Sequence, residues 1–115
     1  MRVGLISDVH ANRVALSAVL ADMPPVETVL CAGDLVGYNP WPAAVVETIR
    51  EREIPTVQGN HDRVLASGRN FPGNEMARAG IRHARAELTD DQIDYLGALP
   101  TERIHFDGRV KVVHG

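Results

Sequence analysis

Cysteine, aromatic residues and long apolar runs are all scarce in this 115-residue sequence. The single cysteine, Cys31, has no partner for an internal disulfide, which fits a reducing compartment. The apolar runs are far shorter than the ~20 residues that span a bilayer, and the charge at Asp8 comes too early for a signal peptide. Twelve Lys+Arg against 15 Asp+Glu give a net charge of −3, so there is no basic excess for binding a nucleic-acid backbone. We therefore expect a cytoplasmic protein that binds neither membrane nor nucleic acid.

What remains is the composition of an ordinary globular domain, with 44% hydrophobic and 23% charged residues. Short apolar runs at 3–6, 27–32 and 54–58 predict buried strands. Helical patterns lie between them: Asn12 is placed to cap the first helix, and Pro42 suits the first turn of the second. Strands alternating with helices across short links are typical of a parallel sheet in the α/β class. We expect residues 1–115 to belong to a single domain.

The later part of the chain has a different pattern. Residues 67–73 predict a loop and residues 74–88 a helix, and Thr89 with Gln92 forms a capping-box pattern for a further short helix. Two stretches at 103–106 and 109–113 flank Asp107-Gly108, a strong signal for a two-residue hairpin turn. Parallel units followed by an antiparallel hairpin predict a mixed or two-sheet architecture.

Polar side chains stand at the carboxyl ends of four predicted strands, where ligands bind in open parallel sheets. Taken singly, each has an ordinary structural explanation, such as a turn aspartate, a helix start or a surface histidine. Together they form a set of oxygen and imidazole donors, which suits Mn, Fe or Zn better than thiolate chemistry does. A carboxylate at the centre of the sheet, such as Asp34, is placed to bridge two ions about 3.5–4 Å apart. The set consists of Asp8, His10, Asp34, Asn60, His61, Asp62 and His114.

The order of these motifs resembles the signature of the calcineurin-like metallophosphoesterase superfamily. The resemblance runs over residues 2–115, and stretches 6–12 and 33–40 are similar to a branch of small prokaryotic cytosolic phosphoesterases. It implies a four-layer α/β/β/α sandwich, of which this chain would form an N-terminal part with a largely parallel first sheet and the start of a second. The motifs that carry it are Asp8-Val9-His10, Gly33-Asp34, Gly59-Asn60-His61-Asp62 and His114.

The resemblance also implies two divalent metal ions, with Mn²⁺ expected and Fe, Zn, Ni or Mg as alternatives. Asp8 and His10 would bind the first ion, and Asn60 and His114 the second. Asp34 would bridge the two.

The activity implied is hydrolysis of a phosphate monoester or diester by a hydroxide that bridges the metals. His61 would not bind metal; it would face the substrate and assist the leaving group. Asp62 would orient His61 through a hydrogen bond. No serine or cysteine nucleophile is required, and Cys31 is interpreted as a packing residue.

Three departures from the family pattern qualify this interpretation. The segment after Asp34 lacks the Asp-Arg-Gly continuation of the protein Ser/Thr phosphatases, so that specificity is not expected. Ala11 stands where this branch has glycine. The family's final Gly-His-x-His segment is not in this chain, so we expect an N-terminal part of a longer, two-sheet enzyme, with weak activity or none on its own.

Substrate contacts are harder to predict. Tyr38, Asn39 and Trp41 follow Asp34 closely enough to shape a pocket, although Trp41 is as well explained as a hydrophobic plug at the start of a helix. Arg63 is a candidate phosphate contact, although solvated loop arginines are commoner. The partner expected is a small phosphate ester, and the oligomeric state is left open. The alternative function is a non-catalytic scaffold with the same fold, which would bind metal without turnover.

Overall fold

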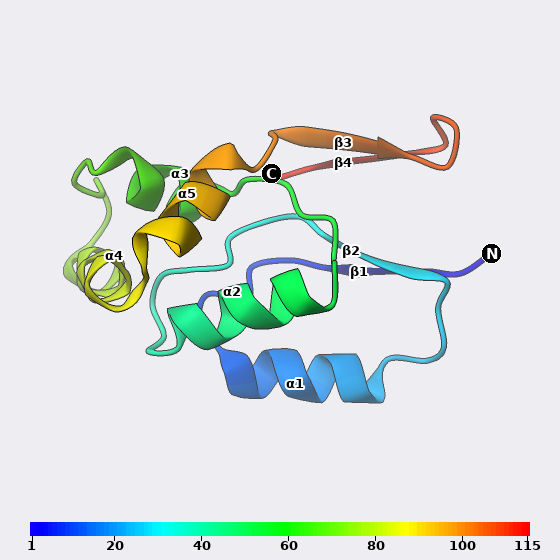
Figure 1. The fold of residues 1–115 in the computed structure, drawn as a ribbon, viewed down its shortest axis with the longest axis horizontal. Coiled ribbons are helices and arrows are strands. Elements are labelled where there is room, and N and C mark those ends of the chain that lie inside the picture. Colours follow the sequence, from blue (N-terminus) through cyan, green and yellow to red (C-terminus); the bar gives the residue numbers. More distant parts are fainter.

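The computed structural model describes residues 1–115 and contains two small sheets and five helices (Figure 1). None of the helices combines the length and apolar character needed to cross a bilayer. In chain order the elements are β1 (Val3–Ile6), α1 (Arg13–Asp22), β2 (Thr28–Cys31), α2 (Pro42–Glu51), α3 (Asn60–Ser67), α4 (Glu75–Glu87), α5 (Asp90–Ala98), β3 (Glu102–His105) and β4 (Val110–Val113).

The first sheet pairs β1 with β2 in parallel, as the alternation of strands and helices predicts. Ile6 lies opposite Cys31. The prediction of a full third strand at 54–58 is wrong, because this segment forms only one parallel bridge, between Cys31 and Thr56. The Cys31 N–H donates to the Pro55 carbonyl, and the Val57 N–H donates back to the Cys31 carbonyl. Pro55 has no N–H of its own, which limits how far the ladder can extend.

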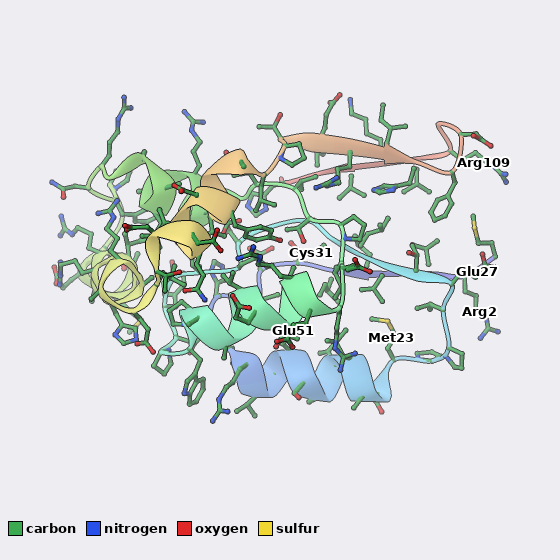
Figure 2. All side chains as sticks on the ribbon, viewed as in Figure 1. Arg2, Met23, Glu27, Cys31, Glu51 and Arg109 are labelled. Atoms are coloured by element: carbon green, nitrogen blue, oxygen red, sulfur yellow. The ribbon has the colours of Figure 1, made fainter.

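The layers are seen edge-on in Figure 1: α1 and α2 lie on one side of β1 and β2, and the β3–β4 hairpin lies on the other. Buried side chains on the helices fill the space against the sheet, among them Leu16 of α1 and Val45, Val46 and Ile49 of α2. Cys31, labelled in Figure 2, is fully buried in this core. This is the mixed α/β arrangement expected, with a parallel first sheet and a second small sheet.

Local signals set the ends of several helices. The Asn12 side chain accepts the Ala15 N–H at 3.0 Å and begins α1. Thr89 and Gln92 bond each other's backbone N–H groups, which confirms the capping box that begins α5. The sequence indicated only the start of a helix at 61–62. The structure has a helix of eight residues there, α3, which ends at Gly68 with φ +75°.

The β3–β4 hairpin is antiparallel, with His105 opposite Val110. Asp107 and Gly108 have φ of +55° and +86°, the positive values that both central residues of a type I′ turn require. The hairpin predicted from Asp107-Gly108 is therefore confirmed. Its second strand ends just before His114, which brings that residue back to the first sheet.

Candidate metal centre

The loops that follow β1 and β2 run side by side at the carboxyl end of the first sheet. Arg2 and Glu27 mark the opposite end (Figure 2). The N–H of Asp8 donates to Gly33 O, and the N–H of His10 donates to Asp34 O, both at 2.9 Å. Helices α3, α4 and α5 gather at this end of the sheet (Figure 1). Parallel pairing therefore brings together residues that lie 24 or more positions apart in the sequence.

The same loops contain an unusual cluster of left-handed backbone. Asp8, His10, Ala11 and Asp34 have φ between +46° and +60°. A residue with a Cβ pays roughly 1–2 kcal/mol for this conformation. Ala11 is the position where the family pattern has glycine, and its φ of +56° gives the physical reason for that preference.

One carboxylate oxygen, Oδ2 of Asp34, lies at the centre of the site. It is 3.0 Å from Nδ1 of His61, 3.4 Å from Nε2 of His114 and 3.6 Å from Nε2 of His10. Asp34 is almost fully buried. Burial opposes ionisation of its carboxyl, but the side-chain and backbone contacts of His61 outweigh this and keep its pKa below the usual value.

Two further oxygen donors complete the cluster. Oδ1 of Asp8 is 3.4 Å from Nε2 of His10, and Oδ1 of Asn60 is 3.0 Å from Nε2 of His114. The structure thus brings all five expected ligands together. Asp8 is in contact with His10, and Asn60 with His114.

Backbone carbonyls fix the orientation of two of the histidines. Nδ1 of His10 lies 2.9 Å from Val36 O, and Nδ1 of His114 lies 2.7 Å from Ala32 O. A carbonyl can only accept, so each Nδ1 carries a hydrogen, and Nε2 is the nitrogen that faces Asp34 and is available to bind a metal ion. This is how proteins usually hold metal-binding histidines.

The donor set fits a pair of cations. Nε2 of His114 lies close to Oδ1 of Asn60 and Oδ2 of Asp34, so a positive ion that replaced the Nε2 hydrogen would gain three ligand atoms. Ligand atoms within 4.8 Å of one another form two groups that share Asp34: one with His10 and His61, the other with Asp8 and His114. The first group includes His61, which the family resemblance excludes as a ligand.

His61 differs from the other two histidines. Its ring is 7% exposed, and no backbone carbonyl holds it. Nδ1 is the nitrogen that meets Asp34, and Nε2 is buried without a hydrogen-bond partner. Because the Asp34 carboxylate is ionised, Nδ1 donates, so the nitrogen that can carry a proton toward the shared centre is Nδ1.

The expected hydrogen bond from Asp62 to the His61 ring is not formed, and that prediction is wrong. The fully buried Asp62 carboxylate instead accepts three backbone N–H groups, those of Asp34, Leu35 and Gly59, each at 2.9 Å. It therefore ties the loop after β2 to the start of α3. Burial raises the pKa of Asp62 to about 6, against the opposing effect of these hydrogen bonds.

The four candidate substrate residues are placed differently. Tyr38 and Asn39 line a cavity of about 300 Å³ beside Asp8 and His10. Trp41 does not line it; it stands at the N-cap of α2 with the Arg13 guanidinium 5.0 Å from its ring centre, which supports the structural interpretation. Arg63 is exposed on α3.

Other participants had no signal in the sequence. The carbonyls of Ala32 and Val36 orient the histidines, but a main-chain oxygen is the same at every residue. Phe71, in the loop before α4, lies against His61. Its position far from every motif gave no reason to select it.

Comparison with known proteins is consistent with this geometry. A family model described as a calcineurin-like phosphoesterase superfamily domain matches residues 1–115. An uncharacterized protein of Methanocaldococcus jannaschii, MJ0912, is 34% identical over 101 residues, covering 85% of this chain and 42% of that protein.

Two solved structures are also similar. A metallophosphoesterase from Sphaerobacter thermophilus is 41% identical with a TM-score of 0.82, over 100% of this chain and 47% of that one. A provisionally assigned diadenosine tetraphosphatase is 25% identical with a TM-score of 0.72, over 98% of this chain and 49% of that one. The chain thus spans less than half the length of each of these proteins.

Proposed function

Since this chain belongs to the calcineurin-like phosphoesterase superfamily, we propose that its site binds two divalent metal ions and hydrolyses a phosphate ester. The observation that carries the proposal is the convergence on Asp34. Two histidines, His10 and His114, are locked by carbonyls with their Nε2 atoms toward one carboxylate oxygen. A buried carboxylate surrounded by oriented imidazoles is an arrangement built for cations.

The residues divide between the two ions as follows. Asp8 and His10 would hold one ion, Asn60 and His114 the other, with Asp34 shared. When bound, the ions would lower the pKa of a water nucleophile toward neutrality and offset charge on the phosphate. Oxygen and imidazole donors suit Mn²⁺, Fe, Zn or Ni, and Mg²⁺ when oxygens dominate; we propose Mn²⁺.

His61 would serve the leaving group. Its Nδ1 lies 3.0 Å from Oδ2 of Asp34, the oxygen at the centre of the site. A positioned acid of this kind contributes roughly 10²–10⁴-fold to rate. To act as an acid, the ring would be protonated on both nitrogens, so that loss of the Nδ1 proton returns it to the neutral form. Nε2 is buried without a hydrogen-bond partner.

The organic part of the ester would enter the cavity next to Asp8 and His10. Its volume of about 300 Å³ is at the lower end of the range for small-molecule sites. Leu16 and Val19 give it apolar walls, and Tyr38 and Asn39 give it an aromatic ring and an amide. A small ester therefore fits better than a protein substrate.

The test measures metal content and turnover on the same purified protein, extended through a Gly-His-x-His segment of the kind that the family resemblance implies. Elemental analysis and hydrolysis of p-nitrophenyl phosphate and bis(p-nitrophenyl) phosphate with Mn²⁺ should give about two ions per site and measurable release of nitrophenolate. His61→Ala should lose roughly 10²-fold or more in kcat while binding metal. His83→Ala, which removes an exposed histidine of α4, is the matched control and should stay active. Metal bound without turnover would favour the scaffold function, and full activity in His61→Ala would remove its assigned role.

A further inference from the structure

The phenyl ring of Phe71 lies flat against the His61 imidazole. The ring centroids are 4.6 Å apart and the planes meet at 26°. The other rings nearby meet His61 differently, since Tyr38 is tilted at 49° and His10 approaches edge-on at 77°. Of these three rings, only that of Phe71 is stacked on the face of the imidazole.

The chain around Phe71 is shaped to hold this ring. A Cβ on Gly73 would stand 2.4 Å from Cε1 of Phe71, so only glycine leaves room for the ring there. The Arg85 side chain reaches from α4 to donate to the carbonyls of Val64 and Arg69, which fixes the segment that leads into the loop. The loop that carries Phe71 is therefore anchored at its start and closely packed at its end.

Gly37 restricts rotation of the His61 ring from another direction. A Cβ at Gly37 would lie 2.8 Å from Cδ2 of His61, and its φ of +97° suits glycine. The edge of the ring thus rests on bare backbone while its face rests on Phe71. Little freedom is left for χ2 rotation, which would take Nδ1 away from Asp34.

This packing supplies what hydrogen bonding supplies elsewhere in the site. A functional histidine is usually oriented through a hydrogen bond at its second ring nitrogen. His10 and His114 have such bonds, to Val36 O and Ala32 O, but the second nitrogen of His61 has none. We propose that Phe71 is a positioning residue, whose stacked ring holds the His61 imidazole in the orientation that aims Nδ1 at the catalytic centre.

The inference rests on the proposed hydrolytic function, because its kinetic consequence is read through His61 as the acid. Phe71→Ala should lower kcat roughly 10- to 100-fold and leave KM within about threefold, because it loosens the acid and leaves substrate binding intact. Phe71→Tyr keeps a flat ring and should retain most of the activity. Phe71→Leu keeps apolar bulk without a flat face and should resemble Phe71→Ala. Recovery in the leucine variant equal to that in the tyrosine variant would overturn stacking as the cause.

Two comparisons separate positioning from general damage. Phe106→Ala removes the chain's other phenylalanine, which packs with the second, smaller core cluster, and should leave kcat unchanged. In a His61→Ala background, Phe71→Ala should cost nothing further in kcat, because its effect passes through the missing imidazole. An additional loss there of the same size as in the intact protein would show that Phe71 acts by another route.

A spectroscopic measurement keeps the inference testable apart from turnover. The ring protons of His61 lie in the shielding region of the phenyl face, so their NMR signals should move downfield in Phe71→Ala and Phe71→Leu but not in Phe106→Ala. If wild-type protein hydrolyses no ester, the proposed function fails, while this shift still decides whether Phe71 holds the ring. Unmoved His61 signals in Phe71→Ala would overturn the inference even in an active enzyme.

Discussion

Replacing Asp62 should destabilise the protein far more than replacing any exposed aspartate. Its carboxylate accepts three buried N–H groups: Oδ2 accepts those of Asp34 and Gly59, and Oδ1 accepts that of Leu35. Asp62→Ala leaves all three donors in the interior without partners. Asp62→Asn keeps the shape but replaces one acceptor oxygen with an NH₂ group.

The size of the effect follows from counting partners. Each orphaned buried donor costs roughly 1–3 kcal/mol, so Asp62→Ala loses about 3–9 kcal/mol from hydrogen bonding. Part of this is offset, because the rise in pKa from 3.8 to about 6 means that the buried carboxylate was itself disfavoured by about 3 kcal/mol. A net loss of about 3 kcal/mol is therefore expected. For Asp62→Asn, with its amide oxygen on the doubly bonded side, only the Leu35 N–H is orphaned, at a cost of roughly 1–3 kcal/mol. The same relief of the buried charge offsets this, so little net change is expected.

Urea unfolding followed by circular dichroism measures these losses. With a slope of about 2 kcal/mol per molar urea, 3 kcal/mol lowers the midpoint by about 1.5 M. Asp94→Ala, an exposed aspartate on α5, should stay within about 0.5 kcal/mol of wild type. A stability of Asp62→Ala above that of wild type, or a larger loss in Asp62→Asn than in Asp62→Ala, would refute the role of Asp62 as a three-way acceptor.

Four other outcomes are expected. Asp34 belongs to both ligand groups, so calorimetric titration with Mn²⁺ should show weaker binding of both ions in Asp34→Asn but of only one in Asn60→Ala; equal losses would contradict the sharing. Burial raises the pKa of the Cys31 thiol to about 11, so the folded protein should not react with a thiol reagent at pH 8 until urea exposes it. Because the unfolded thiol ionises near pH 9, stability should also fall between pH 9 and 11, by up to about 2.7 kcal/mol relative to Cys31→Ala. Chelation with EDTA should remove bound metal and leave the far-ultraviolet circular dichroism unchanged, because backbone bonds, such as that from the His10 N–H to Asp34 O, hold the loops; a collapse of the helical signal would contradict this.

Local features of this fold were predictable where the residues that form them are close together in the sequence. Asn12 caps α1 through its own side chain, Thr89 and Gln92 pair within one turn, and Asp107-Gly108 adopts the backbone that this pair favours. The segment at 54–58 was mispredicted because its apolar pattern is that of a strand, while the missing N–H of Pro55 restricts its pairing to a single bridge.

In the candidate site, too, some features could be predicted from the sequence and others could not. Asp8, His10 and Asp34 meet because the parallel strands β1 and β2 deliver their ends to one edge, which the order of elements already implies. Asn60 instead begins α3, and His114 follows the antiparallel hairpin. The partner of Asp62 was mispredicted because a carboxylate next to a histidine in the sequence need not face it. On α3 the two side chains diverge, so His61 turns to Asp34 while Asp62 turns to the loop backbone. Contacts to main-chain groups that are distant in the sequence, such as those of Asp62 with Asp34 and Leu35, leave no trace in the sequence.

The strained backbone around the site explains why so many hydrogen bonds hold the loops there. Asp8, His10 and Asp34 all have left-handed φ, at a cost of roughly 1–2 kcal/mol each. That geometry persists because the Asp8 and His10 N–H groups are bonded to the neighbouring loop and because Asp62 accepts the Asp34 N–H. The protein therefore bears the cost of orienting its ligands when it folds. Little reorganisation is left for the moment of metal binding, so affinity should depend mainly on the donor atoms and hardly on ordering the loops.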